Sequence, residues 1–129
     1  MVEVKKERGY PHIFNNCFAK NSNDTVFEIS KLFYDNRLNK AATLAYQTVC
    51  DEALKNVNRK NFTMDAFSDL VTKYNEHNIP TYTEMILGLP GETLESFKDG
   101  IDELLEHGQH TSLFVHLCEW LPLAEMGKK

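Results

Sequence analysis

The segment "IPTYTEMILGLPGET", residues 79–93, joins an extended apolar run to a turn rich in glycine and proline, and a helix is expected directly after the turn. Successive side chains of a strand point to opposite faces, so this strand has one face suited to packing under helices and one mixed face. The packing face consists of Thr83, Met85 and Leu87, and the mixed face consists of Tyr82, Glu84, Ile86 and Gly88.

Glu84 is an unusual residue for the middle of a buried parallel strand, because both faces of such strands are usually apolar. Burying a carboxylate without a partner is unfavourable in free energy, so the Glu84 side chain is expected to contact water, to form an ion pair or to face a ligand. In parallel α/β proteins ligands bind at the carboxyl ends of the strands, where the turn 88–91 lies. Gly88 and Gly91 there let the backbone approach a bound molecule, and Pro90 stiffens the turn. A plain strand-to-helix turn and a buried ion pair of Glu84 remain open as alternatives.

The rest of the chain repeats the alternation of strands and helices. Further strands are predicted over residues 11–21, 41–48 and 111–122, and helices are predicted after residues 22–24, Asp51, Thr63 and Thr93. Each of these helix starts offers a capping side chain, and Gly108 lies just past the expected end of the last helix. Alternation of this kind implies parallel strands joined by right-handed crossovers. The sequence therefore predicts one α/β domain over residues 1–129, in which residues 1–10 form a charged N-terminal arm.

Composition and charge narrow the classes of partner. The net charge of −5 argues against a nucleic acid or an anionic membrane surface as partner. No run approaches the roughly 18 consecutive apolar residues of a membrane span, and the N-terminus lacks the apolar core of a secretory signal. The three cysteines have no paired spacing, which is typical of reduced thiols in a cytoplasmic protein. His107 and His110 are a weak candidate for a zinc pair, because no third ligand is visible.

Four segments together resemble the radical S-adenosylmethionine (radical SAM) enzymes. "PTYTEMILGLPGETLESFKDGIDELLEHG" resembles the fifth strand and the following helix of that family, and "AATLAYQTVCDEALKNVNRKN" resembles the fourth strand and its helix. "TSLFVHLCEWLPLAEM" is similar to the sixth strand. "PHIFNNCFAKNSNDTVFEISKLF" resembles the third strand and helix, especially in the group whose full-length members add a cobalamin-binding domain. The resemblance covers nearly the whole chain after residue 10.

The resemblance implies about strands 3–6 of a (β/α)₆ partial TIM barrel that holds S-adenosylmethionine at the carboxyl ends of its strands. Gln47 and Thr48 would then face the ribose or the methionine part, and Arg59 would pair with the methionine carboxylate through its guanidinium fork. Glu84 would contact the polar part of the cofactor or a neighbouring side chain. The adenine would be bordered by Ile86, by the backbone of Gly88 and Leu89, and by Leu117.

The sequence departs from the family at the position of its chemistry. In radical SAM enzymes a [4Fe–4S] cluster, held by a CxxxCxxC triplet after the first strand, reduces S-adenosylmethionine to a 5′-deoxyadenosyl radical. This chain has no such triplet, and segments similar to the first two strands are missing. The chain is therefore expected to bind no cluster alone, and both the cluster and cobalamin are candidate cofactors only of a full-length protein.

The sequence leaves two hypotheses for the function. The first is a fragment of a radical SAM enzyme, inactive alone, which needs the missing N-terminal part of the barrel or self-association to cover its open edge. The second is a cluster-free α/β binding or assembly module without catalysis. Arg59 as a solvated helix-end cation and Gln47 as a strand-end hydrogen-bonding group belong to that second reading. The substrate and the catalytic residues are not readable from this chain.

Overall fold

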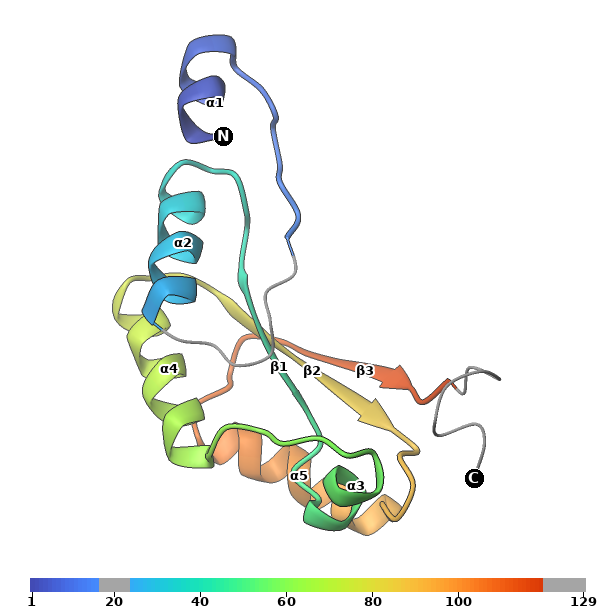
Figure 1. Ribbon diagram of the computed structural model, residues 1–129. Helices are drawn as coiled ribbons and strands as arrows, with labels where there is room; N and C mark the ends of the chain where they lie inside the picture. The colour runs from blue at the N-terminus through green and yellow to red at the C-terminus, as the bar shows by residue number, and fades with distance from the viewer. Residues whose placement is uncertain (17–23, 120–129) are drawn as a thin grey trace.

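The structure is a computed structural model that describes residues 1–16 and 24–119. Its three-stranded sheet is parallel, with the strand order β1-β2-β3, and Figure 1 shows helices alternating with these strands along the chain. The elements are α1 (Val2–Arg8), α2 (Asp24–Asp35), β1 (Ala42–Gln47), α3 (Asp51–Asn56), α4 (Met64–Glu76), β2 (Thr81–Leu87), α5 (Leu94–Glu106) and β3 (Leu113–Leu117). The predicted α/β class with parallel βα units is confirmed for this part of the chain.

The central strand β2 buries one of its faces and leaves the other open. Thr83 and Met85 are 0% exposed, whereas Tyr82 and Glu84, which alternate with them, are half-buried. Met85 lies under α5, because a Cβ atom added at Gly100 would be 3.6 Å from the Met85 methyl carbon. The described helices therefore cover the face that the sequence pattern assigns to packing, and the opposite face, which carries Glu84, is the face that these helices leave uncovered.

Aromatic side chains fill the space between the sheet and α4. The Tyr46 ring on β1 meets the rings of Phe62 and Phe67 edge to face, with centroids 5.3 Å apart in both pairs. Phe67 is fully buried, and its position on α4 places it against both partners. Such ring pairs stabilise a core beyond the apolar area that they bury. This cluster fixes α4 to β1 at the strand's carboxyl end.

Two of the four predicted helix caps, those at Thr63 and Thr93, are present. The Thr63 hydroxyl accepts a hydrogen bond from the Ala66 amide at the start of α4. At the start of α5, Thr93 and Ser96 form a reciprocal capping box, in which the Thr93 amide donates to the Ser96 hydroxyl. Caps of this kind satisfy amides that have no partner inside the helix. They explain why both helices begin where the sequence places them.

A buried glutamine that the sequence reading did not single out joins β2 to β3. Gln109 is 1% exposed, and its amide nitrogen donates to the Thr83 hydroxyl and to the Ser112 carbonyl. Its oxygen accepts from the Thr81 hydroxyl at 2.9 Å. All of these polar groups are satisfied, so the network aligns the amino ends of the two strands without leaving an unpaired buried group.

The N-terminal segment differs from the sequence prediction. Residues 2–8 of the charged arm form α1, and the strand predicted over 11–21 is wrong for residues 11–16, which carry no strand. The Phe14 amide donates to the Leu38 carbonyl at 2.6 Å, and the Ile13 side chain is half-exposed. Proline and two asparagines are poor strand formers, which accounts for the difference. Residues 17–21 of that prediction lie outside the described residues.

The start of α3 and the extent of β3 also differ from the sequence prediction. Cys50, and not Asp51, is the N-cap of α3, and Asp51 opens the helix as its first acidic residue. The last strand is shorter than predicted, because β3 covers residues 113–117 of the expected 111–122. Residues 120–122 of that prediction lie outside the described part of the chain.

The aromatic cluster generates a stability prediction. Phe67→Ala should lower the free energy of unfolding by about 3–5 kcal/mol, because it removes a fully buried ring and leaves a cavity between α4 and β1. Leu94→Ala on α5, where the side chain is 63% exposed, is the control and should change the free energy by less than about 0.5 kcal/mol. Urea unfolding monitored by circular dichroism measures both. Equal effects of the two substitutions would contradict the assigned core.

Candidate functional site

The carboxyl end of β1 presents a hydrogen-bonded pair of polar side chains. The strand carries a register shift between Ala45 and Gln47, and Gln47 has a backbone φ of 71°. Its side-chain oxygen accepts a hydrogen bond from Nη1 of Arg59, which follows α3. Asn61 holds this loop in place, because its amide nitrogen donates to the Tyr46 and Thr48 carbonyls, both at 2.7 Å. The fold thus brings together Gln47 and Arg59, two residues that the resemblance assigned to one ligand.

The two glycines of the turn after β2 have different surroundings. Both have positive φ, 91° at Gly88 and 86° at Gly91. A Cβ atom at Gly88 would meet only the Cys118 Cβ, at 3.9 Å. At Gly91 it would lie 2.5 Å from Nδ2 of Asn56 and 3.0 Å from Cγ of Glu52, both on α3. Gly88 therefore leaves open space at the strand end, whereas Gly91 is required by close packing against α3.

Thr48 is turned toward this turn and away from solvent. The side chain is 0% exposed, and its hydroxyl donates to Oε1 of Glu92 while it accepts from the Cys50 amide at 3.0 Å. The other carboxylate oxygen of Glu92 is buried and has no hydrogen-bond partner. Asn56 adds a second link, from its Nδ2 to the Pro90 carbonyl at 3.0 Å. The Thr48 hydroxyl is therefore engaged with the protein itself.

The uncovered face of the sheet carries a polar pair beside an aromatic pair. Nε2 of His116 on β3 is 3.9 Å from Oε1 of Glu84, and both side chains are partly exposed. The rings of Tyr82 and Phe114 meet edge to face, with centroids 5.4 Å apart. These residues line one hollow in this face. The sequence analysis did not identify His116 as a site residue. Its position two residues after Phe114 in an alternating strand places it on the same face as Phe114, and this pattern could have identified it.

The remaining predicted site residues lie in different environments. Ile86 is on the open face with Glu84 and is half-buried. Leu89 is 6% exposed, so only its backbone can border a ligand. Leu117 pairs with Leu87 in the sheet, and it therefore points to the side opposite Ile86. The structure does not bring Leu117 and Ile86 to one surface of the sheet.

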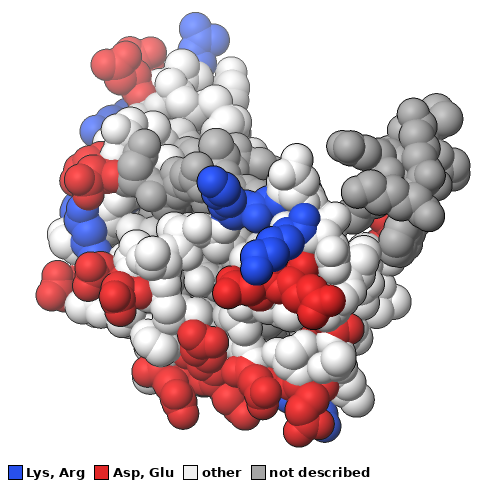
Figure 2. All heavy atoms as spheres, turned by 60° about the horizontal axis from the view of Figure 1, so that its bottom comes forward, with Lys and Arg blue, Asp and Glu red and all other residues white. Residues whose placement is uncertain are grey.

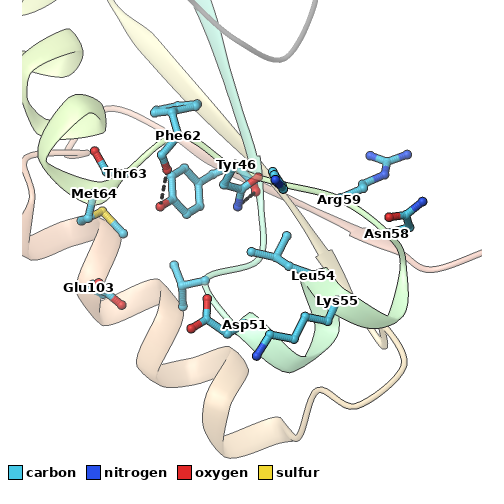
Figure 3. A pocket seen from close by; sticks show the side chains of 13 residues that line it. Tyr46, Asp51, Leu54, Lys55, Asn58, Arg59, Phe62, Thr63, Met64 and Glu103 are labelled. Atoms are coloured by element: carbon cyan, nitrogen blue, oxygen red, sulfur yellow. Dashed lines mark hydrogen bonds between the residues drawn. The ribbon is translucent and has the colours of Figure 1, made fainter.

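A second hollow lies on the helix side of β1 (Figure 3). Tyr46 donates there to the Phe62 carbonyl at 3.1 Å, and burial raises the pKa of Tyr46, to which the Glu103 and Asp51 carboxylates add. The Arg59 side chain points away from both carboxylates (Figure 3). Its charge is therefore available at the strand end and is not neutralised inside this hollow.

The surface of the helical side is mainly acidic. Figure 2 shows more acidic than basic side chains on the face to which α3 and α5 belong. The acidic residues of α5 are Glu95, Asp99, Asp102, Glu103 and Glu106. Against this background the exposed Arg59 is a local cation beside the strand ends.

The described residues do not fit an iron–sulfur cluster. Cys50 and Cys118 are free thiols, and among residues 1–16 and 24–119 no group of three histidine, cysteine, aspartate or glutamate side chains is placed to hold a metal ion. Cys17 lies outside the described residues. Within the same ranges no helix is long and apolar enough to cross a membrane.

Comparison with known proteins gives close relatives over nearly the whole chain. No family model matches the chain. It is 44% identical over 126 residues to the cobalamin-dependent radical SAM methyltransferase TokK of Streptomyces tokunonensis, which is 98% of this chain and 18% of that protein. It is 42% identical over 124 residues to the 2-(S-pantetheinyl)-carbapenam-3-carboxylate methyltransferase of Streptantibioticus cattleyicolor, again 18% of that protein. A probable threonylcarbamoyladenosine tRNA methylthiotransferase of Methanocaldococcus jannaschii is 32% identical over 90 residues.

Over the described residues, the parallel βα units form a small three-stranded α/β sheet that is consistent with part of a barrel. The chain belongs to the radical SAM superfamily, and its similarity extends over nearly its full length to cobalamin-dependent members. The resemblance found in the sequence is thereby confirmed. The chain spans less than a fifth of the length of the two curated relatives it matches over nearly its whole sequence, since it covers 18% of each.

The unequal surroundings of the two glycines generate a prediction. Gly91→Ala should destabilise the chain more than Gly88→Ala does. Both substitutions place a side chain at positive φ, which costs about 1 kcal/mol, but only the Gly91 variant drives a methyl group into α3. Urea midpoints of the two variants, compared with the unchanged chain, measure the difference. Equal midpoints would show that the turn does not pack closely on α3.

Proposed function

We propose that the chain forms part of the core of a radical SAM enzyme and binds S-adenosylmethionine at the carboxyl ends of its strands. The identity of 44% with a cobalamin-dependent radical SAM methyltransferase over nearly the whole chain carries this proposal. The parallel strands β1, β2 and β3 would belong to strands 3–6 of a (β/α)₆ partial barrel. The chain would work in the cytoplasm as one domain, with the rest of the barrel or a second copy as its partner.

The groups at the strand ends match the charges of S-adenosylmethionine. Arg59 uses one guanidinium nitrogen on Gln47, and the other donors of its fork can pair with the methionine carboxylate. Gln47, only 8% exposed, would orient the guanidinium and reach the ribose or the methionine part. Glu84 on the open face would attract the positive part of the cofactor. These are donors and acceptors of suitable chemistry within one edge of the sheet.

The apolar part of the cofactor would use the adjoining strand. Ile86 and the backbone of Gly88 and Leu89 would border the adenine, since among the described residues a Cβ atom at Gly88 would meet the Cys118 Cβ alone, at 3.9 Å. Thr48 has weaker support as a direct contact because its hydroxyl is buried, and Leu117 has weaker support because it lies on the face of the sheet opposite Ile86. We therefore base the proposed site on Gln47, Arg59, Glu84, Ile86, Gly88 and Leu89.

The redox chemistry would belong to other parts of a complete protein. A [4Fe–4S] cluster there would supply the electron that breaks the sulfonium bond of S-adenosylmethionine. Among this chain's described residues no group is placed to hold a metal ion. The names of the relatives support cobalamin and methyl transfer in the complete protein, on a substrate that this chain does not identify.

Binding of the cofactor tests the site. Arg59→Ala and Glu84→Ala should each weaken S-adenosylmethionine binding roughly tenfold or more, because each removes a charged partner of the ligand. Lys60→Ala, which removes the neighbouring exposed cation, is the matched control and should change the affinity less than about twofold. Isothermal titration calorimetry of the chain, with and without a supplied cluster-bearing half of a related enzyme, gives the dissociation constants. Tight binding that ignores both substitutions would remove these residues from the site.

An iron-binding experiment tests the proposal that the [4Fe–4S] cluster belongs to other parts of a complete protein. Anaerobic reconstitution of this chain with iron and sulfide should leave it colourless and without stoichiometric iron, because its described thiols are not grouped. Iron analysis and the visible absorption spectrum provide the measurement, with a cluster-bearing radical SAM enzyme as positive control. One cluster per chain would show that this reading of the cysteines is wrong. No S-adenosylmethionine binding under any of these conditions would favour the cluster-free binding module.

A further inference from the structure

Three segments that are distant in the sequence meet at the carboxyl ends of β1 and β2. They are the end of β1 at Thr48, the helix α3, and the turn between β2 and α5. Thr48 and Glu92, which are 44 residues apart, share a hydrogen bond, and Asn56 donates to the Pro90 carbonyl. The Thr48 hydroxyl also accepts from the Cys50 amide, so one buried hydroxyl connects the start of α3 to the turn. We call Thr48, Glu92 and Asn56 the turn clamp.

The turn clamp lies on the protein side of the turn. Thr48 is 0% exposed, and the close approach at Gly91 leaves no room for a ligand between the turn and α3. At Gly88, three residues earlier, an added Cβ atom would meet only the Cys118 Cβ among the described residues, at 3.9 Å. Contacts behind the turn and open backbone in front of it are the arrangement expected of a support for a binding surface.

Among the described residues, few other interactions fix this turn. The Glu92 amide donates to the Leu89 carbonyl at 3.1 Å, the Cys50 thiol lies 4.0 Å from the Gly91 carbonyl, and the Leu89 side chain is buried. The Cys118 amide also donates to the carbonyl of Leu87, which ties the last residue of β2 to the end of β3. Gly88 and Gly91 have intrinsic backbone freedom, so the position of the turn has to come from contacts outside it. The turn clamp provides these contacts from α3 and β1.

We propose that Thr48, Glu92 and Asn56 are positioning residues that hold the Gly88–Pro90 backbone at the distance from β1 which the cofactor site requires. They act through the turn and touch no ligand. The inference rests on the proposed function, because it assigns to these residues the support of the proposed S-adenosylmethionine site. It also separates the role of Thr48 from that of its neighbour Gln47, which reaches the surface through Arg59.

The first experiment measures the turn itself and needs no ligand. In Thr48→Val the hydroxyl is replaced by a methyl group of similar size, so Glu92 and the Cys50 amide lose their shared partner. The Glu92 amide should then lose at least about tenfold of its protection against hydrogen exchange, measured by NMR. The Thr83 amide, bonded to the Ser112 carbonyl within the sheet, is the internal reference and should keep its protection. Equal loss at both amides would indicate general destabilisation and would overturn the proposal.

The second experiment asks for rescue by conservative changes. Thr48→Ser keeps the donating hydroxyl, and Glu92→Gln keeps an accepting oxygen, so both should retain the protection of the Glu92 position and the affinity for S-adenosylmethionine. Thr48→Val and Glu92→Ala should weaken the affinity roughly tenfold. Combining these two should cost little more than either alone, because they break one interaction. Glu106→Ala, at an exposed acidic position of α5, is the control and should change neither quantity.

The outcomes separate the two proposals. If the unchanged chain binds S-adenosylmethionine and Arg59→Ala weakens binding, while Thr48→Val and Glu92→Ala do not, the proposed function stands and the turn clamp is wrong. If the unchanged chain binds no S-adenosylmethionine, the proposed function fails for this chain, and the exchange of the Glu92 amide still decides whether the clamp fixes the turn. Normal protection in Thr48→Val would refute the clamp in either case.

Discussion

The two-sided character of β2 is the constraint on which the rest of the structure depends. Thr83 and Met85 have to be covered, and α5 covers them, with Gly100 small enough for the helix to approach. Because side chains alternate along the strand, covering these residues necessarily turns Glu84 and its neighbours to the opposite side. A shift of the register by one residue would bury the Glu84 carboxylate under α5. The open polar face therefore follows from the packing of the apolar one.

Side chains near the carboxyl ends of the strands fall into two groups, one that positions the turn and one that can interact with other molecules. The buried Thr48 and the exposed Asn56 hydrogen-bond to Glu92 and to the Pro90 carbonyl, and these contacts set where the backbone of the turn lies. The exposed Arg59 and the partly exposed Glu84 have donors and acceptors that can interact with other molecules. The two sets are linked at β1, where Gln47 and Thr48 are adjacent in the sequence yet have different partners. The register shift at this point allows consecutive side chains to serve both sets.

Local signals in the sequence predicted most of the fold, and contacts between distant residues account for what it missed. The caps at Thr63 and Thr93 and the alternation around Glu84 are read within a few residues, and the structure confirms them. The strand over residues 11–16 failed because isolated apolar residues, without a partner strand, do not specify pairing. The link between Thr48 and Glu92 spans 44 residues, so no local pattern announces it. The family resemblance supplied Gln47 and Arg59, whose contact the structure shows.

Under the proposed function, the charges of Arg59 and Glu84 would suit a zwitterionic ligand better than a simple anion or cation. Arg59 is an exposed cation, and Glu84 is an acidic group whose Oε1 lies 3.9 Å from Nε2 of His116. A ligand carrying a carboxylate together with a positive group can satisfy both ends of this edge at once, whereas an ion of one sign meets attraction at one end and repulsion at the other. S-adenosylmethionine has this distribution of charge. Under the proposed function, the selectivity would come from the separation between Arg59, in the segment after α3, and Glu84 on β2.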